Sequence, residues 1–373
     1  MRYLSAADPK EFQGKTCLLR VDFNVENRKE DFRLFAVLPT IHWLLRADAK
    51  VVLLSHRGRP EQTFQVSNLK FQVSPDETLK IIIPFLKNHL KTPVKFFPNL
   101  DVKKINRATK KAAPGSLFLV ENLRLFAGET NNDPAFAQTL SQLGEIYVSD
   151  AFSVCHRAHA SVATLPTLLP SYAGLLLERE VRSLTRVLNT HEKPLVLIIG
   201  GAKASDKIGV VEHFLPKADA ILGGGAAANT FLKARGDDIK SSHYEPAMAD
   251  HARSLLHHHN IILPTDFVEH EEKYLDIGPE TVKAFVKKLK AAKTIVWNGP
   301  MGMFEDGRFA AGSRKLARAI VKTHAFTLAG GGETTQLITK MKLGHKFSFL
   351  STGGGAMLAF LAGKKLPGIE ALS

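Results

Sequence analysis

The chain has 373 residues, and its 50 Lys and Arg residues outnumber its 36 Asp and Glu residues, giving a formal net charge of +14. Hydrophobic residues make up 45% and charged residues 23% of the chain, which excludes a collagenous or low-complexity protein and argues against wholesale disorder. The length is about 2.5 times that of a typical domain, so we expect two domains.

Three features of the sequence favour a location in the cytoplasm. No apolar run reaches the 18 residues of a membrane span. The first residues, MRYLSAADPKEFQGK, contain no apolar core of the kind that a signal peptide needs. The 2 cysteines cannot build a disulfide framework of the kind found in small secreted proteins.

The positive charge is compatible with nucleic acid, anionic lipid or a small acidic substrate. Basic residues gather at 103–111 and 283–293, in segments with the pattern of surface helices. We interpret both as solvated helix faces, because no aromatic interleaving and no zinc-finger spacing accompanies them. The sequence therefore predicts no membrane partner and no specific nucleic-acid partner.

Short runs rich in Val, Ile and Leu alternate with helical patterns along the whole chain. Continuous apolar strands that alternate with helices are typical of parallel sheets covered on both faces. The two series predict two doubly wound α/β domains. The runs lie at 16–23, 50–56, 94–98, 117–123 and 146–152 in the first half, and at 195–201, 220–225, 261–267, 294–300, 326–332 and 347–355 in the second.

A helix is predicted over 171–188, between the two series. Leu177, Val181, Leu184 and Leu188 repeat at helical spacing, and Ser171 follows a proline and could cap the helix. Such a helix would serve as a stiff connector. From the pattern alone, an ordinary helix inside one domain is an equally good interpretation.

Polar residues follow the predicted strands of the first half, and at least three strand ends deliver an arginine. Ligands of parallel sheets bind beyond the carboxyl ends of the strands. Arginine forms bidentate hydrogen bonds with carboxylate and phosphate groups. The pattern favours a small acid carrying both groups over a set of unrelated surface ion pairs. The residues are Asp22, Asn24, Arg33, His56, Arg57, Arg59, Glu121, Asn122, Arg124, Asp150, His156, Arg157 and His159.

The predicted strands of the second half end in glycines instead. Glycine lets a backbone approach a ligand closely and expose consecutive N–H groups, and a following helix adds an anion site at its N-terminus. Five such turns in one domain favour a phosphate-bearing ligand, with Lys203 and Lys207 as point charges. The turns are at 200–201, 223–225, 299–302, 330–332 and 353–355.

The two halves together suggest phosphoryl transfer. Neither a P-loop nor the glycine fingerprint of dinucleotide-binding domains is present, which argues against a P-loop NTPase and a standard dehydrogenase. Transfer between two anions needs in-line positioning, charge neutralisation and exclusion of water, which two closing domains could supply.

At these residues the chain resembles phosphoglycerate kinases over nearly its whole length. Many motifs occur in the same order, which makes a chance match negligible. They include RVDFNV (20–25), SHRGRP (55–60), ENLRLFAGE (121–129), SDAFSVCHRAHAS (149–161), GGAKASDKIGV (200–210), VWNGPMGMFE (296–305), AGGGETT (329–335) and STGGGA (351–356).

The resemblance implies a monomeric, hinge-bending glycolytic kinase that interconverts ATP and 3-phosphoglycerate with ADP and 1,3-bisphosphoglycerate, using Mg²⁺ bound with the nucleotide. It implies a 3-phosphoglycerate-binding domain over 1–170, a connecting helix over 171–188 and a nucleotide-binding domain over 189–357. The tail, 358–373, would return to the first domain.

The resemblance also implies a role for individual residues. Arg33, Lys203, Gly332 and Gly355 would act in catalysis, and Glu333 would bind the metal. Substrate would bind to Asp22, Asn24, Arg33, His56, Arg59, Arg124 and Arg157. Nucleotide would bind to Gly201, Lys203, Lys207, Gly224, Asn298, Pro300, Glu305, Gly331, Gly332, Glu333 and Thr334.

The chain departs from the family pattern at a few positions. Glu333 stands where the family usually has Asp, Glu26 replaces a turn proline, and Ala359 replaces a glutamate. The loop between Glu26 and Arg33 is also shorter than usual. We expect these changes to tune the rate rather than abolish it, since every arginine and both lysines remain.

Two other hypotheses stay open from the sequence. A protein with this fold that has lost catalysis would bind nucleotide or phosphoglycerate without turnover. A nucleic-acid-binding module would bind arbitrary DNA or RNA in a salt-sensitive way. Cys155 lies beside His156 and Arg157, which could lower the pKa of its thiol, but a nucleophilic role is disfavoured because phosphoryl transfer needs no covalent intermediate. Cys17 lies in a strand pattern and is interpreted as buried packing, and the histidines at 257–259 as an exposed tract.

Overall fold

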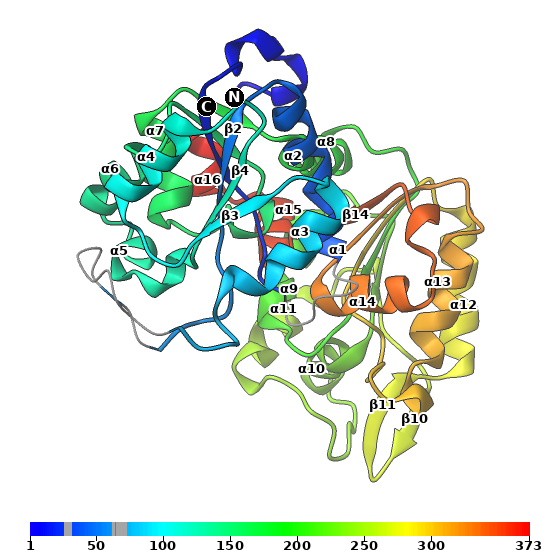
Figure 1. Ribbon diagram of the computed structural model, residues 1–373. Coiled ribbons are helices and arrows are strands. Elements are labelled where there is room, and N and C mark those ends of the chain that lie inside the picture. Colours follow the sequence, from blue (N-terminus) through cyan, green and yellow to red (C-terminus); the bar gives the residue numbers. More distant parts are fainter. Residues whose placement is uncertain (26–31, 62–63, 65–72) are drawn as a thin grey trace. The chain divides into compact units, whose positions relative to one another are not determined.

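The computed structural model of the chain describes residues 1–25, 32–61, 64 and 73–373. Contacts divide the chain into two compact units (Figure 1). Unit 1 comprises Met1–Val181 and Lys365–Ser373, and unit 2 comprises Arg182–Lys364. Glu26 and most of the short loop before Arg33 lie outside the described residues, so their expected effect stays a prediction.

Unit 1 is built on a six-stranded parallel sheet with the strand order β3-β4-β2-β1-β5-β6. Its strands are β1 (Thr16–Arg20), β2 (Lys50–Leu54), β3 (Val94–Phe97), β4 (Leu117–Val120), β5 (Ile146–Ser149) and β6 (Ser171–Ala173). Its helices are α1 (Phe32–Ala36), α2 (Leu38–Arg46), α3 (Ile83–Leu90), α4 (Val102–Lys111), α5 (Ala127–Thr130), α6 (Pro134–Ser141), α7 (Leu165–Leu168) and α16 (Pro367–Glu370).

The central strands of unit 1 are apolar because both of their faces are covered. Leu18 and Leu19 point to opposite faces of β1, and both are completely buried. Helix α4 instead has a charged outer face, and the side chain of Asp101 accepts a hydrogen bond from the Lys104 amide at its N-terminus. The basic residues at 103–111 therefore lie along a capped surface helix.

Unit 2 repeats the architecture with the strand order β14-β13-β12-β7-β8-β9, again parallel. Its strands are β7 (Leu195–Ile199), β8 (Ala220–Gly223), β9 (Ile261–Ile262), β12 (Thr294–Asn298), β13 (Phe326–Gly330) and β14 (Phe349–Ser351). Its helices are α9 (Ser205–Phe214), α10 (Gly225–Arg235), α11 (Ala249–Leu255), α12 (Pro279–Ala291), α13 (Ala311–Ile320), α14 (Gly332–Lys340) and α15 (Gly355–Leu361).

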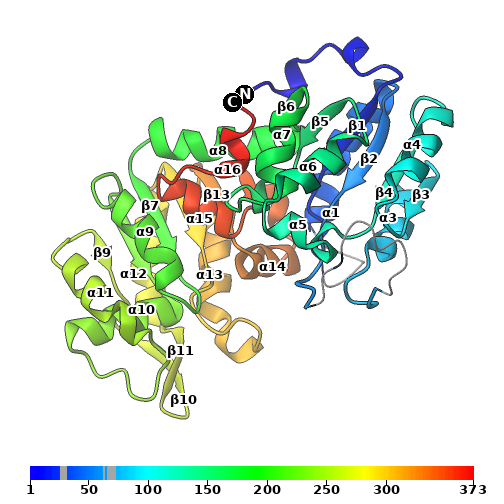
Figure 2. The same cartoon turned by 90° about the vertical axis from the view of Figure 1, so that its left-hand side faces the viewer.

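An antiparallel hairpin of β10 (Phe267–His270) and β11 (Lys273–Ile277) extends from unit 2 (Figures 1 and 2). The sequence pattern did not predict it. Its turn residues, Glu271 and Glu272, both adopt the left-handed backbone conformation that hairpin turns usually assign to glycine or asparagine. The turn therefore lacks the glycine or asparagine that would have marked a hairpin in the sequence.

The predicted fold class is confirmed, and every predicted apolar run contains a strand. The connecting helix is α8 (Leu175–Asn189), which contains the division between the units. Residues 171–173 form β6 rather than the start of this helix, because they pair with the edge of the sheet beside β5. Ser171 consequently does not cap the helix: its hydroxyl donates to the carbonyl oxygens of Pro166 and Leu169.

The C-terminal segment returns to unit 1 at Lys365, later than the expected 358. Residues 358–361 belong to α15, which packs on α9 within unit 2. The amide of Gly368 then donates to the carbonyl oxygen of Cys155, and a Cβ at Gly368 would lie 2.6 Å from Val162. The two termini consequently lie close together in unit 1 (Figure 2).

Among the described residues, no helix combines the length and apolarity of a membrane span.

Candidate active site

The carboxyl ends of the central strands of unit 1 bring polar side chains together. Asp22 follows β1 and His56 follows β2, with His56 Nε2 lying 3.7 Å from Asp22 Oδ1. Asp22 Oδ1 accepts from the Asn24 amide at 2.8 Å, and the Asn24 side chain accepts from the Gly58 amide at 2.8 Å. The ends of β1 and β2 are thereby held together by the side chains predicted to bind substrate.

Arginines surround this junction. Arg33 Nη1 donates to the carbonyl oxygen of Asn24 at 2.9 Å and lies 4.0 Å from Asp22 Oδ2. Arg124, in the short helix that follows β4, donates to the carbonyl oxygen of Gly58 at 2.6 Å. We call Arg33, Arg59, Arg124 and Arg157 the arginine rim.

Electrostatic interactions link three members of the rim, Arg59, Arg124 and Arg157. Burial, together with the charges of Arg157 and Arg20, lowers the pKa of Arg124 to about 10. Burial and the charge of Arg59 lower the pKa of Arg157. The protonated forms of Arg124 and Arg157 are thus destabilised by neighbouring positive charge, and a bound small anion would relieve that repulsion.

Two of the polar residues that follow predicted strands, Arg57 and Glu121, have structural roles instead. The Arg57 side chain is buried, and its Nε and Nη1 donate to the backbone carbonyl oxygens of Val25 and Pro75. The Glu121 carboxylate accepts from the Thr78 hydroxyl and the Leu79 amide. Both side chains follow strands, but they fix loops rather than face a ligand.

Sequence reasoning missed the charged layer beneath the rim. Arg20 belongs to an apolar strand, and Glu129 lies in the helix α5, yet both are completely buried and lie 3.8 Å apart. The hydroxyl of Ser161 bridges them. The signal in the sequence was an arginine inside the otherwise apolar run 17–21.

In unit 2 hydrogen bonds connect the strand ends with the glycine turns. The ammonium of Lys207, in α9, donates to Asn298 Oδ1 at the end of β12, and the Asn298 amide donates to the carbonyl oxygen of Gly330 at 3.0 Å. The buried hydroxyl of Thr334 accepts from the Gly299 amide at 2.8 Å. The ends of β12 and β13, helix α9 and the start of α14 are thus connected by predicted nucleotide-binding residues.

Two of the glycines are required by close backbone approach. Gly299 has φ +90°, and a Cβ there would lie 2.1 Å from the carbonyl oxygen of Gly200. Gly225 has φ +59°, and a Cβ there would lie 2.8 Å from the Gly201 amide nitrogen. No other residue type fits either position without moving the backbone.

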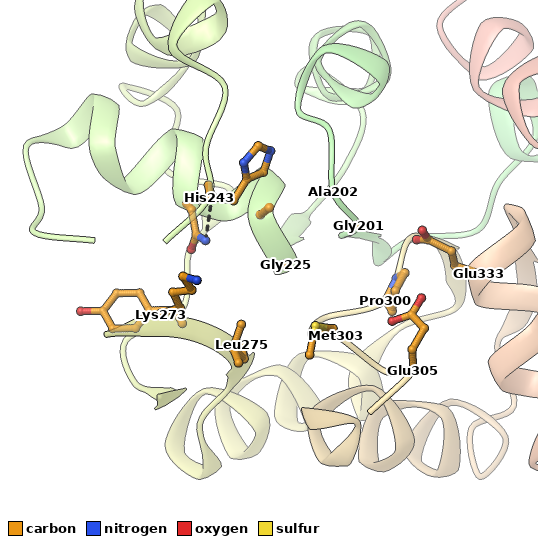
Figure 3. A pocket seen from close by; sticks show the side chains of 14 residues that line it. Gly201, Ala202, Gly225, His243, Lys273, Leu275, Pro300, Met303, Glu305 and Glu333 are labelled. Carbon is orange, nitrogen blue, oxygen red and sulfur yellow. Dashed lines mark hydrogen bonds between the residues drawn. The ribbon is translucent and has the colours of Figure 1, made fainter. Parts of the chain in front are cut away.

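A pocket of about 270 Å³ opens beside these turns (Figure 3). Glu305 and Glu333 lie at one end of it, and His243 and Lys273 at the other. Of the predicted nucleotide residues, Gly201, Pro300, Glu305 and Glu333 line the pocket. Lining residues that the sequence did not suggest are Asn229, His243, Lys273, Tyr274, Leu275 and Met303.

The two carboxylates at the acidic end influence each other. Burial and the neighbouring Glu305 raise the pKa of Glu333, while Lys207 opposes that shift. The described residues contain no cluster of three or more His, Cys, Asp or Glu side chains that could hold a metal ion alone.

The remaining predicted residues of unit 2 lie in loops or at the starts of helices. Lys203 is exposed, and its charge helps to lower the pKa of Glu245. The Gly224 amide donates to the carbonyl oxygen of Ile199, and Gly331 precedes α14 with φ +96°. Gly332 and Gly355 are the first residues of α14 and α15. None of these five lines the pocket.

The environments of Cys17 and Cys155 make both thiols unreactive. Burial raises the pKa of Cys155 to about 12 and raises that of Cys17 further. Cys155 Sγ contacts the carbonyl oxygen of Ala151 and packs against Gly368. A raised thiol pKa suppresses the thiolate that nucleophilic or redox chemistry requires.

Comparison with known proteins gives one consistent answer. The profile of the family described as "Phosphoglycerate kinase" matches residues 7–364. A phosphoglycerate kinase of Herpetosiphon aurantiacus is 40% identical over 391 residues, covering 97% of this chain and 97% of that protein. One from Thermus thermophilus is 40% identical over 402 residues and covers 100% of both chains.

Solved structures agree with the sequence comparison. Phosphoglycerate kinase from Pyrococcus horikoshii superposes with a TM-score of 0.88 at 31% identity, covering 100% of this chain and 98% of that one. The enzyme from Coxiella burnetii gives a TM-score of 0.83 at 34% identity, covering 99% and 98%. The likeness therefore extends over both units.

Proposed function

This chain belongs to the phosphoglycerate kinase family and is a glycolytic phosphotransferase, and we propose which of its residues perform the reaction. The reaction moves a phosphoryl group reversibly between ATP and the carboxyl group of 3-phosphoglycerate. Its two substrates are anions, so the protein must neutralise charge and align the reacting atoms.

Unit 1 binds 3-phosphoglycerate. The arginine rim offers planar, bidentate hydrogen-bond donors for the carboxylate and the phosphate. Asp22, Asn24 and His56 provide polar contacts at the junction of β1 and β2, where Asp22 is only 6% exposed. Arg33 neutralises the carboxylate that accepts the phosphoryl group. The clustering of arginines, in which burial and neighbouring arginines lower the pKa values of Arg124 and Arg157, is the observation that carries this assignment.

Unit 2 binds the nucleotide. The pocket accepts the nucleoside, with the acidic end next to the ribose through Glu305. The phosphates meet the glycine turns and Lys207, and Lys203 stabilises the phosphoryl group during transfer. Gly201, Gly224, Asn298, Pro300, Gly331 and Thr334 frame these contacts, while Gly332 and Gly355 donate backbone N–H groups from the first turns of their helices.

Mg²⁺ accompanies the nucleotide, and the donor set suits it. Mg²⁺ is usually held by one or two carboxylates plus substrate phosphates, so the absence of a closed protein cluster among the described residues is compatible with it. Glu333 provides the carboxylate. When bound with ATP, the ion neutralises charge on the β- and γ-phosphates.

The enzyme acts as a monomer in the cytoplasm, and its partners are small molecules. Direct in-line transfer requires the two substrates, held on separate units, to be brought together in a closing motion. The basic face of α4 is solvated and serves solubility rather than nucleic-acid binding.

The test is a coupled assay with ATP, Mg²⁺ and 3-phosphoglycerate, in which glyceraldehyde-3-phosphate dehydrogenase consumes NADH. Arg33→Ala and Lys203→Ala should each reduce kcat/KM by at least about 100-fold, because each removes a charge at the reacting groups. Arg107→Ala and Lys104→Ala, which remove exposed charges on α4, are the matched controls.

Each outcome has a distinct meaning. Normal rates in the controls with lost turnover in the two variants would support both assignments. No turnover in the unaltered, folded protein would overturn the proposed activity and leave a binding protein. Unchanged rates for Arg33→Ala or Lys203→Ala would remove that residue from the reaction.

A further inference from the structure

Arg20 is a charged residue in a place that normally excludes charge. It ends β1, and its side chain is 0% exposed. Burying a guanidinium is costly unless every donor is satisfied. The partners of Arg20 therefore indicate what its burial does for the surrounding residues.

All three nitrogen atoms of the Arg20 guanidinium have partners. Nε donates to the hydroxyl of Ser161 at 2.9 Å, and Nη1 donates to the carbonyl oxygen of Val21 at 2.5 Å. Nη2 lies 3.8 Å from Glu129 Oε1 and 3.1 Å from Nδ1 of His56. The position of the guanidinium is fixed from three directions.

Ser161 and Glu129 are held in turn. The Ser161 hydroxyl donates to Glu129 Oε1 at 2.6 Å, and its amide donates to Glu129 Oε2 at 2.9 Å. The Tyr147 hydroxyl donates to the carbonyl oxygen of Ser161 at 2.7 Å. Both oxygens of the completely buried carboxylate are thereby occupied.

The contact with His56 determines where the imidazole carries its proton. A guanidinium has only donors, so Nδ1 of His56 must accept from Arg20. A neutral imidazole that accepts at Nδ1 carries its hydrogen on Nε2. Nε2 is the atom that lies 3.7 Å from Asp22 Oδ1, at the junction of β1 and β2.

We propose that Arg20, Ser161 and Glu129 form a buried positioning network that holds His56 as a neutral Nε2–H donor toward the phosphoglycerate substrate. This inference rests on the proposed function for the identity of the substrate. Arg20 acts through His56 and does not itself touch the ligand, since its side chain is completely buried.

The charges that face His56 from its neighbouring elements favour the same state. Burial lowers the pKa of His56 most, and positive groups on neighbouring elements lower it further. These groups are Arg20 on β1, Arg124 after β4, and Arg157 and His159 after β5. Asp22 is the nearest carboxylate on the Nε2 side. A proton on Nδ1 would point at the Arg20 guanidinium, so geometry and charge exclude the imidazolium together.

The direct test is the ¹⁵N spectrum of selectively labelled histidine. Long-range ¹H–¹⁵N correlations distinguish a protonated ring nitrogen from an unprotonated one, and His56→Gln assigns the signals by their loss. We expect His56 to show unprotonated Nδ1 and protonated Nε2 throughout pH 6 to 8. A proton on Nδ1, or titration within that interval, would overturn the proposal.

Enzyme kinetics provide a second test, which distinguishes a role of Arg20 in positioning His56 from a role in stability alone. Arg20→Met should raise KM for 3-phosphoglycerate about tenfold and change KM for ATP less than twofold, because the network belongs to unit 1. If Arg20→Met does not fold, Ser161→Ala removes only the bridging hydroxyl and should raise the same KM about threefold. Arg46→Met, at an exposed position of α2, is the matched control.

A double-mutant cycle separates action through His56 from general loosening. In a His56→Ala background, Arg20→Met or Ser161→Ala should have no further effect on KM for 3-phosphoglycerate. An undiminished effect there would contradict the proposal. Absence of turnover in the unaltered protein would instead contradict the proposed function, while the ¹⁵N spectrum would still test the network.

Discussion

The ammonium group of Lys207 donates a hydrogen bond to Oδ1 of Asn298, 2.5 Å away, and so joins helix α9 to the end of strand β12. Burial lowers the pKa of Lys207. The other side of the Asn298 amide donates to the carbonyl oxygen of Gly330, at the end of the neighbouring strand β13. One neutral side chain therefore fixes both a cation and a glycine turn.

Asn298→Ala should raise KM for ATP about tenfold, because Lys207 loses the acceptor that directs it and Gly330 loses a donor. KM for 3-phosphoglycerate should stay within about twofold, since Asn298 belongs to unit 2. Initial rates with each substrate varied in turn measure both constants. Asn106→Ala, which removes an amide of unit 1 that donates to the Gln142 carbonyl oxygen, is the control. An unchanged KM for ATP would contradict the assignment.

The sequence predicted those parts of the fold that depend on local pattern. Buried parallel strands are apolar on both faces, so runs such as 195–201 are visible without tertiary information. The arginine rim was also predictable, because Arg124 and Arg157 follow strands whose carboxyl ends must share one edge of the sheet.

The features that the sequence did not predict depend on contacts between residues far apart in the chain. Strand β6 has 3 residues and exists because it pairs with β5, so no local signal marks it. Arg57 follows β2 like a rim residue, but the backbone of Val25 and Pro75 captures it. The network beneath the rim joins Arg20 to residues more than 100 positions away, and such pairings are invisible to periodicity.

Gly332→Ala separates the ligand-related role of a glycine from its structural one. A Cβ at Gly332 would meet no atom within 4 Å, and the residue begins α14, so the free energy of unfolding should change by less than about 0.5 kcal/mol. KM for ATP should nevertheless rise about tenfold, because the added methyl group occupies the approach of a phosphate to the helix N-terminus.

Gly299→Ala is the contrasting variant. Its Cβ would lie 2.1 Å from a backbone oxygen in a left-handed conformation, so unit 2 should lose about 3 kcal/mol or more. Urea unfolding and nucleotide titrations on both proteins distinguish the two effects. Normal ATP affinity in Gly332→Ala would remove that residue from the phosphate site.

Glu333 predicts a pH dependence of metal-linked nucleotide binding. Burial and Glu305 raise the pKa of its carboxyl group, so a proton is retained to higher pH than on an ordinary glutamate. Because Mg²⁺ needs the ionised form, the Mg²⁺ concentration for half-maximal rate should fall as pH rises through this raised pKa.

Glu305→Gln removes the neighbouring charge and should move that transition to lower pH. The measurement is the Mg²⁺ dependence of the rate at fixed ATP from pH 5.5 to 8. Glu280→Gln, an exposed carboxylate on α12, is the matched control. The same transition in Glu305→Gln and in the unaltered protein would show that the two carboxylates are not coupled.

Asp150 predicts a pH dependence of stability at the start of the connecting helix. Its Oδ1 accepts from the Leu177 amide at 3.0 Å, and burial raises its pKa to about 7. Since the unfolded chain releases this proton near pH ~3.9, folded unit 1 holds more protons between the two values. The contribution of Asp150 to stability is therefore lost as pH rises from about 4 to about 7.

Asp150→Asn keeps an acceptor for Leu177 and removes the ionisation, so it should stabilise the protein more at pH 7.5 than at pH 5. The difference should be about 2 kcal/mol, or about 5 °C in Tm by calorimetry. Asp48→Asn makes the same chemical change at an exposed residue with φ +57°, a conformation that asparagine also adopts, and should show no such difference. A gain that is equal at both pH values would mean that Asp150 stays ionised in the folded protein, with the Leu177 amide compensating its charge.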